Sequence, residues 1–213
     1  RQRIAEAGLE VSGLSSGVHV LTESDEKRAR NAEEVVEYGK LCKQLGVGII
    51  RIFGGRYGRR TEAQAAAEMV DQLRGYSDTV GPEVTLAIET HDDFCKTDVL
   101  GEVVETTARD NVRVLWDLHH PYRIGGETPE QTYGHIGRYT VGTHIKDSRK
   151  TPEKFEYTLA GEGDVPLAEM IRLLLDGGYA GWFTLEWEKK WKPELPGAEE
   201  ALPSYAKFLR SFE

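Results

Sequence analysis

The chain has 213 residues, of which 39% are hydrophobic and 30% are charged. This balance is typical of a folded domain rather than a disordered segment. Its 27 Lys and Arg against 36 Asp and Glu give a net charge of −9, which disfavours a nucleic-acid partner because binding to a phosphate backbone usually requires a basic surface. No apolar run approaches the roughly 20 residues that span a bilayer, and we recognise no signal peptide.

The cysteine content indicates the compartment. Cys42 and Cys95 stand far apart and outside any CxxC spacing. This favours a reducing compartment and argues against a disulfide scaffold or a zinc site built from cysteines. We therefore expect a cytoplasmic protein with no nucleic-acid partner and no membrane partner.

Short apolar runs alternate along the chain with longer segments of helical spacing. In chain order we expect a strand at Leu9–Leu14, a helix at Ser24–Leu45, a strand at Gly48–Phe53, a helix at Thr61–Tyr76, a strand at Val84–Glu89, a helix at Lys96–Arg109, a strand at Val112–Trp116, a helix at Pro129–Ile136, a strand at Thr140–Ile145, a weak strand at Phe155–Leu159, a helix at Leu167–Asp176, a strand at Trp182–Glu186 and a helix at Glu199–Phe212. Such alternation predicts parallel strands joined by crossover helices. No linker or shift in composition divides the chain, so we expect one α/β domain over residues 1–213.

Two architectures fit this alternation, an open doubly wound sheet and a (β/α)8 TIM barrel. An open dinucleotide-binding sheet should carry a glycine-rich phosphate turn, and no GxGxxG occurs in the sequence. Four strong strands instead end in an acid or a histidine, at Glu89, Asp117, His144 and Glu186. Polar residues at the carboxyl ends of strands are typical of a TIM barrel with its chemistry at that face. We therefore predict a barrel.

The start of the chain does not fit a complete barrel. Residues 1–8 have the pattern of the end of a helix with no strand before it. If Leu9–Leu14 is the second strand and Phe155–Leu159 the seventh, the first strand of the barrel is absent. We therefore expect the N-terminal βα unit to be missing, and seven strands would leave two exposed edges.

The four strand-end residues form a set of hard ligands, three carboxylates and one imidazole. A single acid at such a position is usually a helix cap or a surface group. Four together on converging strands would repel one another without a counter-ion. Such a set suits one divalent ion, with Mn²⁺, Mg²⁺ or Co²⁺ favoured and Zn²⁺ also acceptable.

Six motifs in a fixed order resemble those of a known family. They are IRIFGG (Ile50–Gly55), AIETHDDF (Ala87–Phe94), WDLHHP (Trp116–Pro121), GTHIKD (Gly142–Asp147), AGEGDVPL (Ala160–Leu167) and GWFTLEWEKKW (Gly181–Trp191). From Leu9 onward the chain is similar to the xylose isomerase-like superfamily of sugar phosphate isomerases and epimerases. That superfamily includes D-tagatose 3-epimerase-like enzymes, inosose dehydratase, hydroxypyruvate isomerase and the endonuclease IV group.

The resemblance implies roles for particular residues. Glu89, Asp117, His144 and Glu186 would be the metal ligands, and Glu89 and Glu186 would also be the catalytic acid/base pair. His120 matches the histidine of the family's WDxxH motif, which contacts a substrate hydroxyl. The neighbouring histidine, one position earlier, is the competing candidate.

Further residues near strand ends are candidates for substrate binding. His91 lies two residues beyond Glu89 and would point toward the site if the strand continues. Arg51, Lys146 and Arg149 would hold a substrate oxygen or a phosphate. The alternative for these cations is a salt bridge with a neighbouring acid, and for His91 a place in a loop.

The expected function is that of a divalent-metal-dependent isomerase or epimerase of a sugar or sugar phosphate. It would abstract a proton next to a carbonyl through an enediolate. Loss of a β-hydroxyl would instead give dehydration, as in an inosose dehydratase-like lyase. The sequence does not choose among these outcomes and leaves a homo-oligomer open.

Two alternatives come from other classes of protein. An endonuclease IV-like phosphodiesterase is disfavoured by the acidic net charge and because the run at Gly48–Phe53 is followed by Gly54-Gly55 rather than a histidine. A non-catalytic sugar-binding barrel is the other alternative, because a fold does not guarantee an activity.

Overall fold

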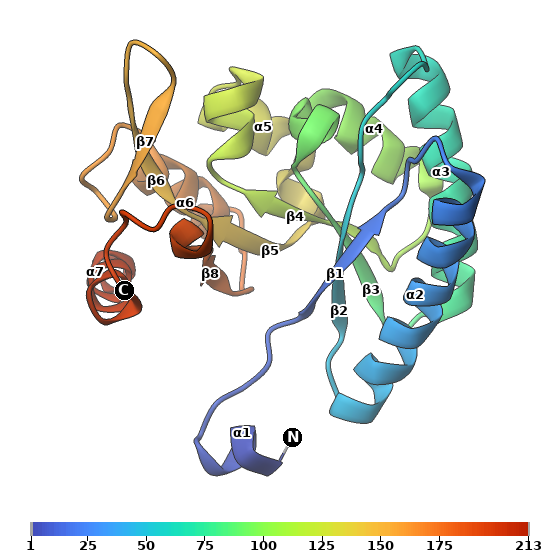
Figure 1. Ribbon diagram of the computed structural model, residues 1–213, viewed down its shortest axis with the longest axis horizontal. Coiled ribbons are helices and arrows are strands. Elements are labelled where there is room, and N and C mark those ends of the chain that lie inside the picture. The colour runs from blue at the N-terminus through green and yellow to red at the C-terminus, as the bar shows by residue number, and fades with distance from the viewer. Residues whose placement is uncertain (1, 213) are drawn as a thin grey trace.

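A curled sheet of six parallel strands forms the centre of the computed structural model, which describes residues 2–212 (Figure 1). The strands are β1 (Leu14–His19), β2 (Ile49–Phe53), β3 (Thr85–Glu89), β4 (Val112–Asp117), β5 (Thr140–Ile145) and β8 (Phe183–Leu185). They lie side by side in the order β1-β2-β3-β4-β5-β8, and each neighbouring pair is parallel. The expected arrangement of parallel strands is therefore confirmed.

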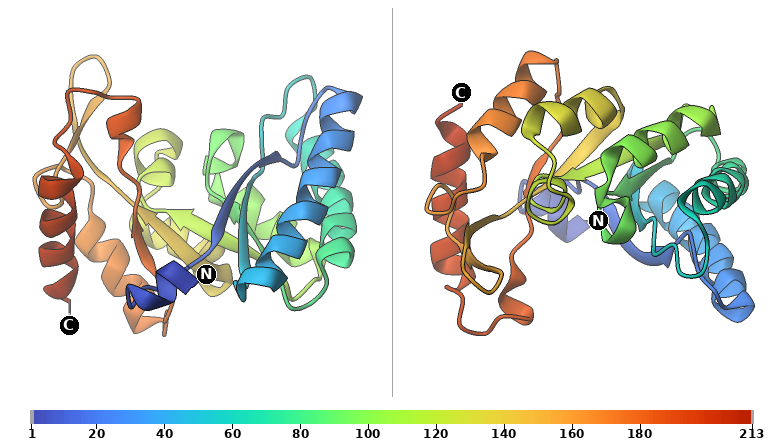
Figure 2. Two further views of the ribbon diagram at one scale, coloured as in Figure 1. Left: turned by 60° about the horizontal axis from the view of Figure 1, so that its bottom comes forward. Right: turned by 90° about the horizontal axis from the view of Figure 1, so that it is seen from above.

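Helices cover the outer face of this sheet. They are α2 (Asp25–Leu45), α3 (Glu62–Val80), α4 (Thr97–Thr107), α5 (Pro129–Ile136), α6 (Leu167–Asp176) and α7 (Ala198–Arg210). Figure 2 shows them following one another around the outside of the sheet, as in a TIM barrel that does not close. Thr61 and Thr128 cap the N-termini of α3 and α5 with capping boxes. In each box the threonine hydroxyl accepts a hydrogen bond from the backbone N–H of a glutamine three residues later, and the side chain of that glutamine accepts one from the backbone N–H of the threonine. Within residues 2–212, no helix has the length and apolar character needed to cross a bilayer.

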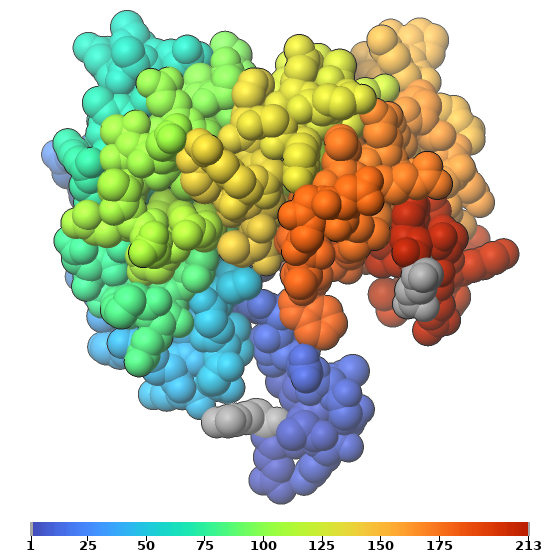
Figure 3. Space-filling view, turned by 180° about the vertical axis from the view of Figure 1, so that it is seen from behind, coloured from blue at the N-terminus to red at the C-terminus, as the bar shows by residue number. Residues whose placement is uncertain are grey.

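The first strand begins later than the sequence pattern predicts. The expected strand Leu9–Leu14 is wrong, because β1 runs over Leu14–His19 and pairs with β2. Leu9 is 64% exposed and lies in the segment between the short helix α1 (Gln2–Glu6) and the sheet, and Figure 3 shows this segment projecting from the body. The buried residues of β1 are Ser16 and Val18. The strand contains serine and glycine, which are typical of turns. They obscure the alternation of buried and exposed residues that would have predicted the strand from the sequence.

The expected seventh strand does not join the sheet. Residues Phe155–Thr158 form β7, which pairs antiparallel with β6 (Asp147–Lys150) in a separate hairpin. β8 pairs directly with β5, so six described strands make up the sheet rather than seven. The FEYT sequence of β7 is polar at alternate positions, which suits a ribbon with one wet face better than a strand covered on both faces.

The two faces of the sheet differ in what they contact. Ile50 and Ile52 of β2 are fully buried and belong to the apolar core under the helices. Arg51 and Phe53 lie on the opposite, concave face, because side chains alternate along a strand. The parallel register sets Phe53 beside Glu89, so that the polar ends of neighbouring strands gather on the concave side.

Candidate metal centre

Four acidic and imidazole side chains meet at the carboxyl ends of the strands. Glu89 and Asp117 are the last residues of β3 and β4, His144 lies in β5, and Glu186 follows β8. In the register of the sheet, Asp117 pairs with His144, which in turn pairs with Thr184 two residues before Glu186. One ligand atom of each of the four residues lies within 4.8 Å of the others. The structure thus brings together the four residues that the sequence singled out.

Exposure differs sharply among these four side chains. Glu89 is 1% exposed, Asp117 0% and His144 9%, whereas the Glu186 side chain is 33% exposed. Three of the side chains therefore form the floor of the site, and Glu186 forms its edge toward solvent.

Two cations compensate the carboxylates in this structure, the buried Lys146 and the partly buried Arg51. Lys146 Nζ lies 2.6 Å from Asp117 Oδ2 and also pairs with Glu186 Oε2. Arg51 Nε lies 3.2 Å from Glu89 Oε2. His144 Nδ1 is between two glutamates, 3.2 Å from Glu89 Oε1 and 3.4 Å from Glu186 Oε1.

Electrostatics keeps the buried carboxylates ionised. Burial alone would raise the pKa of Glu89, but the hydrogen bond and charge of His144 outweigh it and lower the pKa. Burial likewise opposes the charge of Asp117, yet His120, Lys146 and His144 hold its pKa well below its usual range. For Lys146, the charges of Asp117 and Glu186 overcome burial and raise the pKa. Metal ligands must be deprotonated, and at neutral pH these carboxylates are.

Two carboxylate oxygens of the cluster face cations without a well-aligned hydrogen bond. Among the described residues, buried Glu89 Oε2 and Asp117 Oδ2 have no hydrogen bond of good geometry, and they lie 3.2 Å from Arg51 Nε and 2.6 Å from Lys146 Nζ. The other oxygen of Asp117, Oδ1, is fixed by the backbone N–H groups of His119 and His120 at 2.9 and 3.2 Å. Asp117 Oδ2 therefore faces Lys146 and the cluster. Carboxylate oxygens with one imidazole are the donor set that a hard or borderline divalent ion prefers.

The two histidines after Asp117 have different surroundings. His120 Nδ1 lies 3.0 Å from the carbonyl oxygen of Thr90, and because a carbonyl only accepts, Nδ1 carries the proton. Its Nε2 is then the acceptor nitrogen of the neutral ring. His119 Nε2 lies 2.9 Å from Ser148 Oγ, and burial lowers the pKa of His119 to about 3. The structure thus places His120 beside the cluster and His119 under the β6–β7 hairpin.

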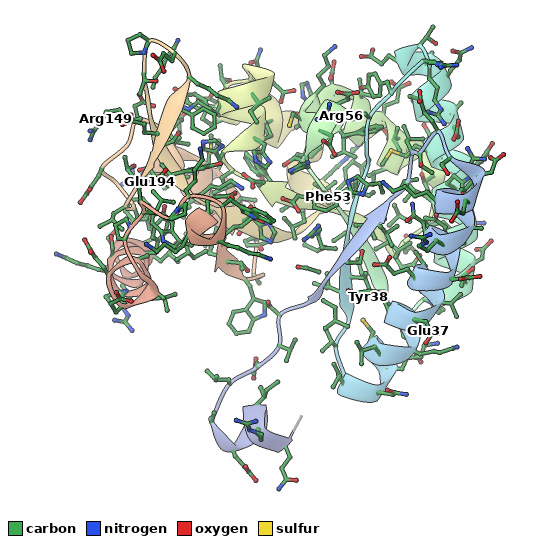
Figure 4. All side chains as sticks on the ribbon, viewed as in Figure 1. Glu37, Tyr38, Phe53, Arg56, Arg149 and Glu194 are labelled. Atoms are coloured by element: carbon green, nitrogen blue, oxygen red, sulfur yellow. The ribbon has the colours of Figure 1, made fainter. Side chains whose placement is uncertain are left out.

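Four of the five residues expected to bind substrate lie around the cluster, His120 among them. Arg51 and Lys146 contact its carboxylates, as the alternative of salt bridges also predicted. The His91 ring packs against that of His120, with their centroids 4.9 Å apart. Arg149 is not brought to the cluster, because it is exposed on β6 and donates to the carbonyl oxygen of Glu162 (Figure 4).

Sequence reasoning missed the residues that hold the hairpin beside the site. The Asp147 carboxylate is buried and accepts from the backbone N–H groups of Ser148, Gly161 and Gly163 at 2.7, 2.9 and 3.1 Å. Arg123 donates to Ser148 Oγ at 3.1 Å and to its carbonyl oxygen at 3.0 Å. The signal was present in the two glycines of AGEGD, which allow the loop to approach a carboxylate closely.

Comparison with known proteins gives the family. The model of the family "Xylose isomerase-like TIM barrel" matches residues 1–212. No curated protein matches the chain in sequence. Solved structures with the same fold include a xylose isomerase domain protein from Planctomyces limnophilus, with a TM-score of 0.79 and 21% identity over 99% of this chain and 79% of that one.

The names of two further similar structures mention a bound metal or an enzyme activity. IolI protein with a binding zinc atom has a TM-score of 0.81 and 22% identity over 96% of this chain and 78% of that one. L-ribulose 3-epimerase has a TM-score of 0.78 and 18% identity over 98% of this chain and 76% of that one. At these identities the likeness shows the fold, and together with the family match it confirms the predicted fold class. The chain belongs to the xylose isomerase-like TIM barrel family.

Proposed function

We propose that the protein is a divalent-metal-dependent sugar isomerase or epimerase that moves a proton next to a carbonyl group. The observation that carries this proposal is the cluster of Glu89, Asp117, His144 and Glu186, whose ligand atoms lie within 4.8 Å of one another. The names of two structural neighbours, a zinc-bound IolI protein and an L-ribulose 3-epimerase, support it.

The four residues of the cluster would hold the ion. When bound, a divalent ion would polarise the carbonyl and neighbouring hydroxyl oxygens of the substrate and stabilise the negative charge that develops there. The substrate would arrive from the side of Glu186, because that side chain alone among the four is one third exposed.

Glu89 and Glu186 are the proposed acid/base pair. Both carboxylates flank the His144 imidazole, so they approach the centre of the cluster from different strands. One carboxylate removes the proton from the carbon next to the carbonyl. Return of a proton by the other to the opposite face gives epimerisation, and return to the neighbouring carbon gives isomerisation.

Lys146 and His120 have positioning and binding roles in this proposal. The Lys146 ammonium holds Glu186 Oε2, which leaves Glu186 Oε1 on the side of His144. His120 offers Nε2 as an acceptor for a substrate hydroxyl, since its Nδ1 is held by the Thr90 carbonyl. Arg51 and His91 complete the wall of the site on the side of β2 and β3.

The test is exchange of a carbon-bound hydrogen of the substrate with deuterium from D₂O. Purified protein with Mn²⁺, Mg²⁺, Co²⁺ or Zn²⁺ is incubated with D-ribulose, D-tagatose or D-fructose, and exchange is followed by NMR. We expect metal-dependent exchange that falls at least about 100-fold in Glu186→Gln, the usual scale for loss of an acid/base group.

Glu194→Gln is the matched control, because Glu194 is an exposed carboxylate in the segment that follows Glu186. This variant should retain the wild-type exchange rate. Exchange that persists in EDTA, or that is the same in Glu186→Gln as in the wild type, would rule the proposal out. A chain that binds ketoses with no exchange would be a sugar-binding barrel instead.

A further inference from the structure

A row of aromatic rings follows the strand ends beside the metal cluster. The ring of His19 stacks on Phe53 with centroids 4.9 Å apart, and Phe53 lies 4.8 Å from His91. His91 in turn lies 4.9 Å from His120. The row therefore leads from His19, at the carboxyl end of β1, to His120, which we propose to bind a substrate hydroxyl.

The end of this row near β1 is accessible. The side chains of His19 and His91 are 32% and 38% exposed. Phe53 is half-buried, and the Arg51 guanidinium lies 3.9 Å from the centroid of its ring. Phe53 is paired in register with Glu89, so this surface continues directly from the cluster.

A pocket opens beside His19. It is lined by His19, Leu21, Thr22, Glu23, Lys27, Arg56, Gly58 and Asp92. These residues come from the end of β1, the first turn of α2 and the segments that follow β1, β2 and β3. Figure 4 shows the labelled Phe53 and Arg56 at this end of the sheet. Asp92 of the pocket contacts His91, and the His91 ring packs against His120 beside the cluster, so the pocket adjoins the row of rings.

The charges of the pocket are balanced. Asp92 Oδ2 lies 3.2 Å from His91 Nδ1 and 3.8 Å from His19 Nε2, and Asp92 Oδ1 lies 3.5 Å from Arg56 Nε. Glu23 and Lys27 add one further charge of each sign to the lining. The φ of Asp92 is 50°, in the left-handed region that aspartate adopts more readily than most residues other than glycine.

This balance distinguishes two kinds of substrate. A phosphate entering the pocket would meet the Asp92 carboxylate and an Arg56 that is already paired. Hydroxyl groups, which donate and accept, would find partners of both kinds, and the half-exposed rings would pack against the C–H faces of a sugar.

We propose that the pocket of His19, Arg56 and Asp92, with the Phe53 ring, is the subsite for the end of the substrate remote from the reacting carbons, and that it selects an unphosphorylated sugar. The inference rests on the proposed function, and it names the substrate class of the same site.

The test compares each free ketose with its phosphate ester. Binding of D-fructose and D-fructose 6-phosphate, and of D-ribulose and D-ribulose 5-phosphate, is measured by calorimetry on the Mg²⁺-loaded full chain. We expect the free ketoses to bind at least about tenfold more tightly than their esters. Phe53→Leu should weaken binding of the free ketoses several-fold, and Asp92→Asn should reduce the preference because it removes the charge that repels phosphate.

Asp78→Asn is the matched control, because Asp78 is an exposed carboxylate on α3 paired with Arg109. This variant should prefer free ketoses over their esters to the same extent as the wild type. Circular dichroism checks that each variant is folded, and the comparison of ketose with ester in the wild type does not depend on any variant. Esters that bind as tightly as the free ketoses, absence of binding by either, or a preference unchanged in Asp92→Asn would each overturn the proposal.

Deuterium exchange on the same samples separates this inference from the proposed function. Exchange confined to the phosphate esters would overturn the subsite while supporting the isomerase or epimerase activity. Tight binding of free ketoses, sensitive to Phe53 and Asp92 but without exchange under any metal, would support the subsite and overturn the proposed activity.

Discussion

Lys146 shows how single residues balance the charge of this site. Its side chain is 1% exposed, and its ammonium faces the carboxylates of Asp117, Glu186 and Glu188, the last at 3.6 Å. Removal of one partner from a buried ion pair leaves the other charge uncompensated. The stability lost in this way exceeds the net stability that the intact pair contributes. Lys146 therefore stabilises the cluster when no divalent ion does.

Replacement of this lysine should make folding depend on metal. We expect Lys146→Met to lower the free energy of unfolding in EDTA by about 3 kcal/mol, because buried carboxylates lose their counter-ion. Excess Mn²⁺ should restore much of this loss. Lys150→Met, at an exposed position on β6, should change little in either condition. Urea unfolding of the three proteins in EDTA and in Mn²⁺ measures these stabilities. Equal stability of wild type and Lys146→Met in EDTA would contradict this account of the lysine.

Asp92 should contribute stability that depends on pH. The hydrogen bond from His91, and the charges of His91, His19 and Arg56, lower the pKa of Asp92 from its ordinary value of 3.8. A carboxylate with a lowered pKa stabilises the fold above its unfolded pKa and loses this contribution as the pH falls through the folded value. We expect Asp92→Asn to cost about 0.5–1 kcal/mol at pH 6 and nearly nothing at pH 2.

Urea unfolding of both proteins at the two pH values measures this difference. If the cost of Asp92→Asn were the same at pH 6 and at pH 2, the charge of Asp92 would not be its source.

The elements differ in how well their sequence predicts them. Buried parallel strands such as β3 and β4 read as continuous apolar runs that end in Glu89 and Asp117, so both the strand and the ligand were predictable. β1 contains Ser16 and Gly17, and its pairing with β2 is determined by contacts distant in sequence. The β6–β7 hairpin has little apolar character, and it is held by the buried Asp147 carboxylate rather than by a pattern along the chain.

The glycines test this difference between elements. A Cβ at Gly163 would collide with the Asp147 carboxylate and the Ser148 carbonyl oxygen, whereas a Cβ at Gly75 in α3 would meet nothing within 4 Å. We expect Gly163→Ala to destabilise the protein by about 1–3 kcal/mol through this overpacking. Gly75→Ala should instead stabilise it by about 0.4–1 kcal/mol, because alanine restricts the unfolded chain. Thermal unfolding compares the two, and a neutral Gly163→Ala would show that Asp147 does not fix the loop.

At the scale of the whole molecule, the site exists because the sheet curls. Glu89, Asp117, His144 and Glu186 come from four different strand ends, and only the curvature brings those ends within ligand distance (Figure 2). The convergence was predictable from four polar strand ends in an α/β alternation. The ion pairs of Lys146 and the hairpin over His119 were not, because they depend on side-chain geometry between elements remote in sequence.

The central claim is that these four residues form a metal site, and metal binding tests it most directly. Metal content by elemental analysis, followed by calorimetry with Mn²⁺, should show one ion per chain in the wild type and in Glu194→Gln. Binding should weaken at least about tenfold in Glu186→Gln, which keeps the shape of the side chain but removes its charge. Absence of bound metal in the wild type, or an affinity unchanged in Glu186→Gln, would contradict the claim.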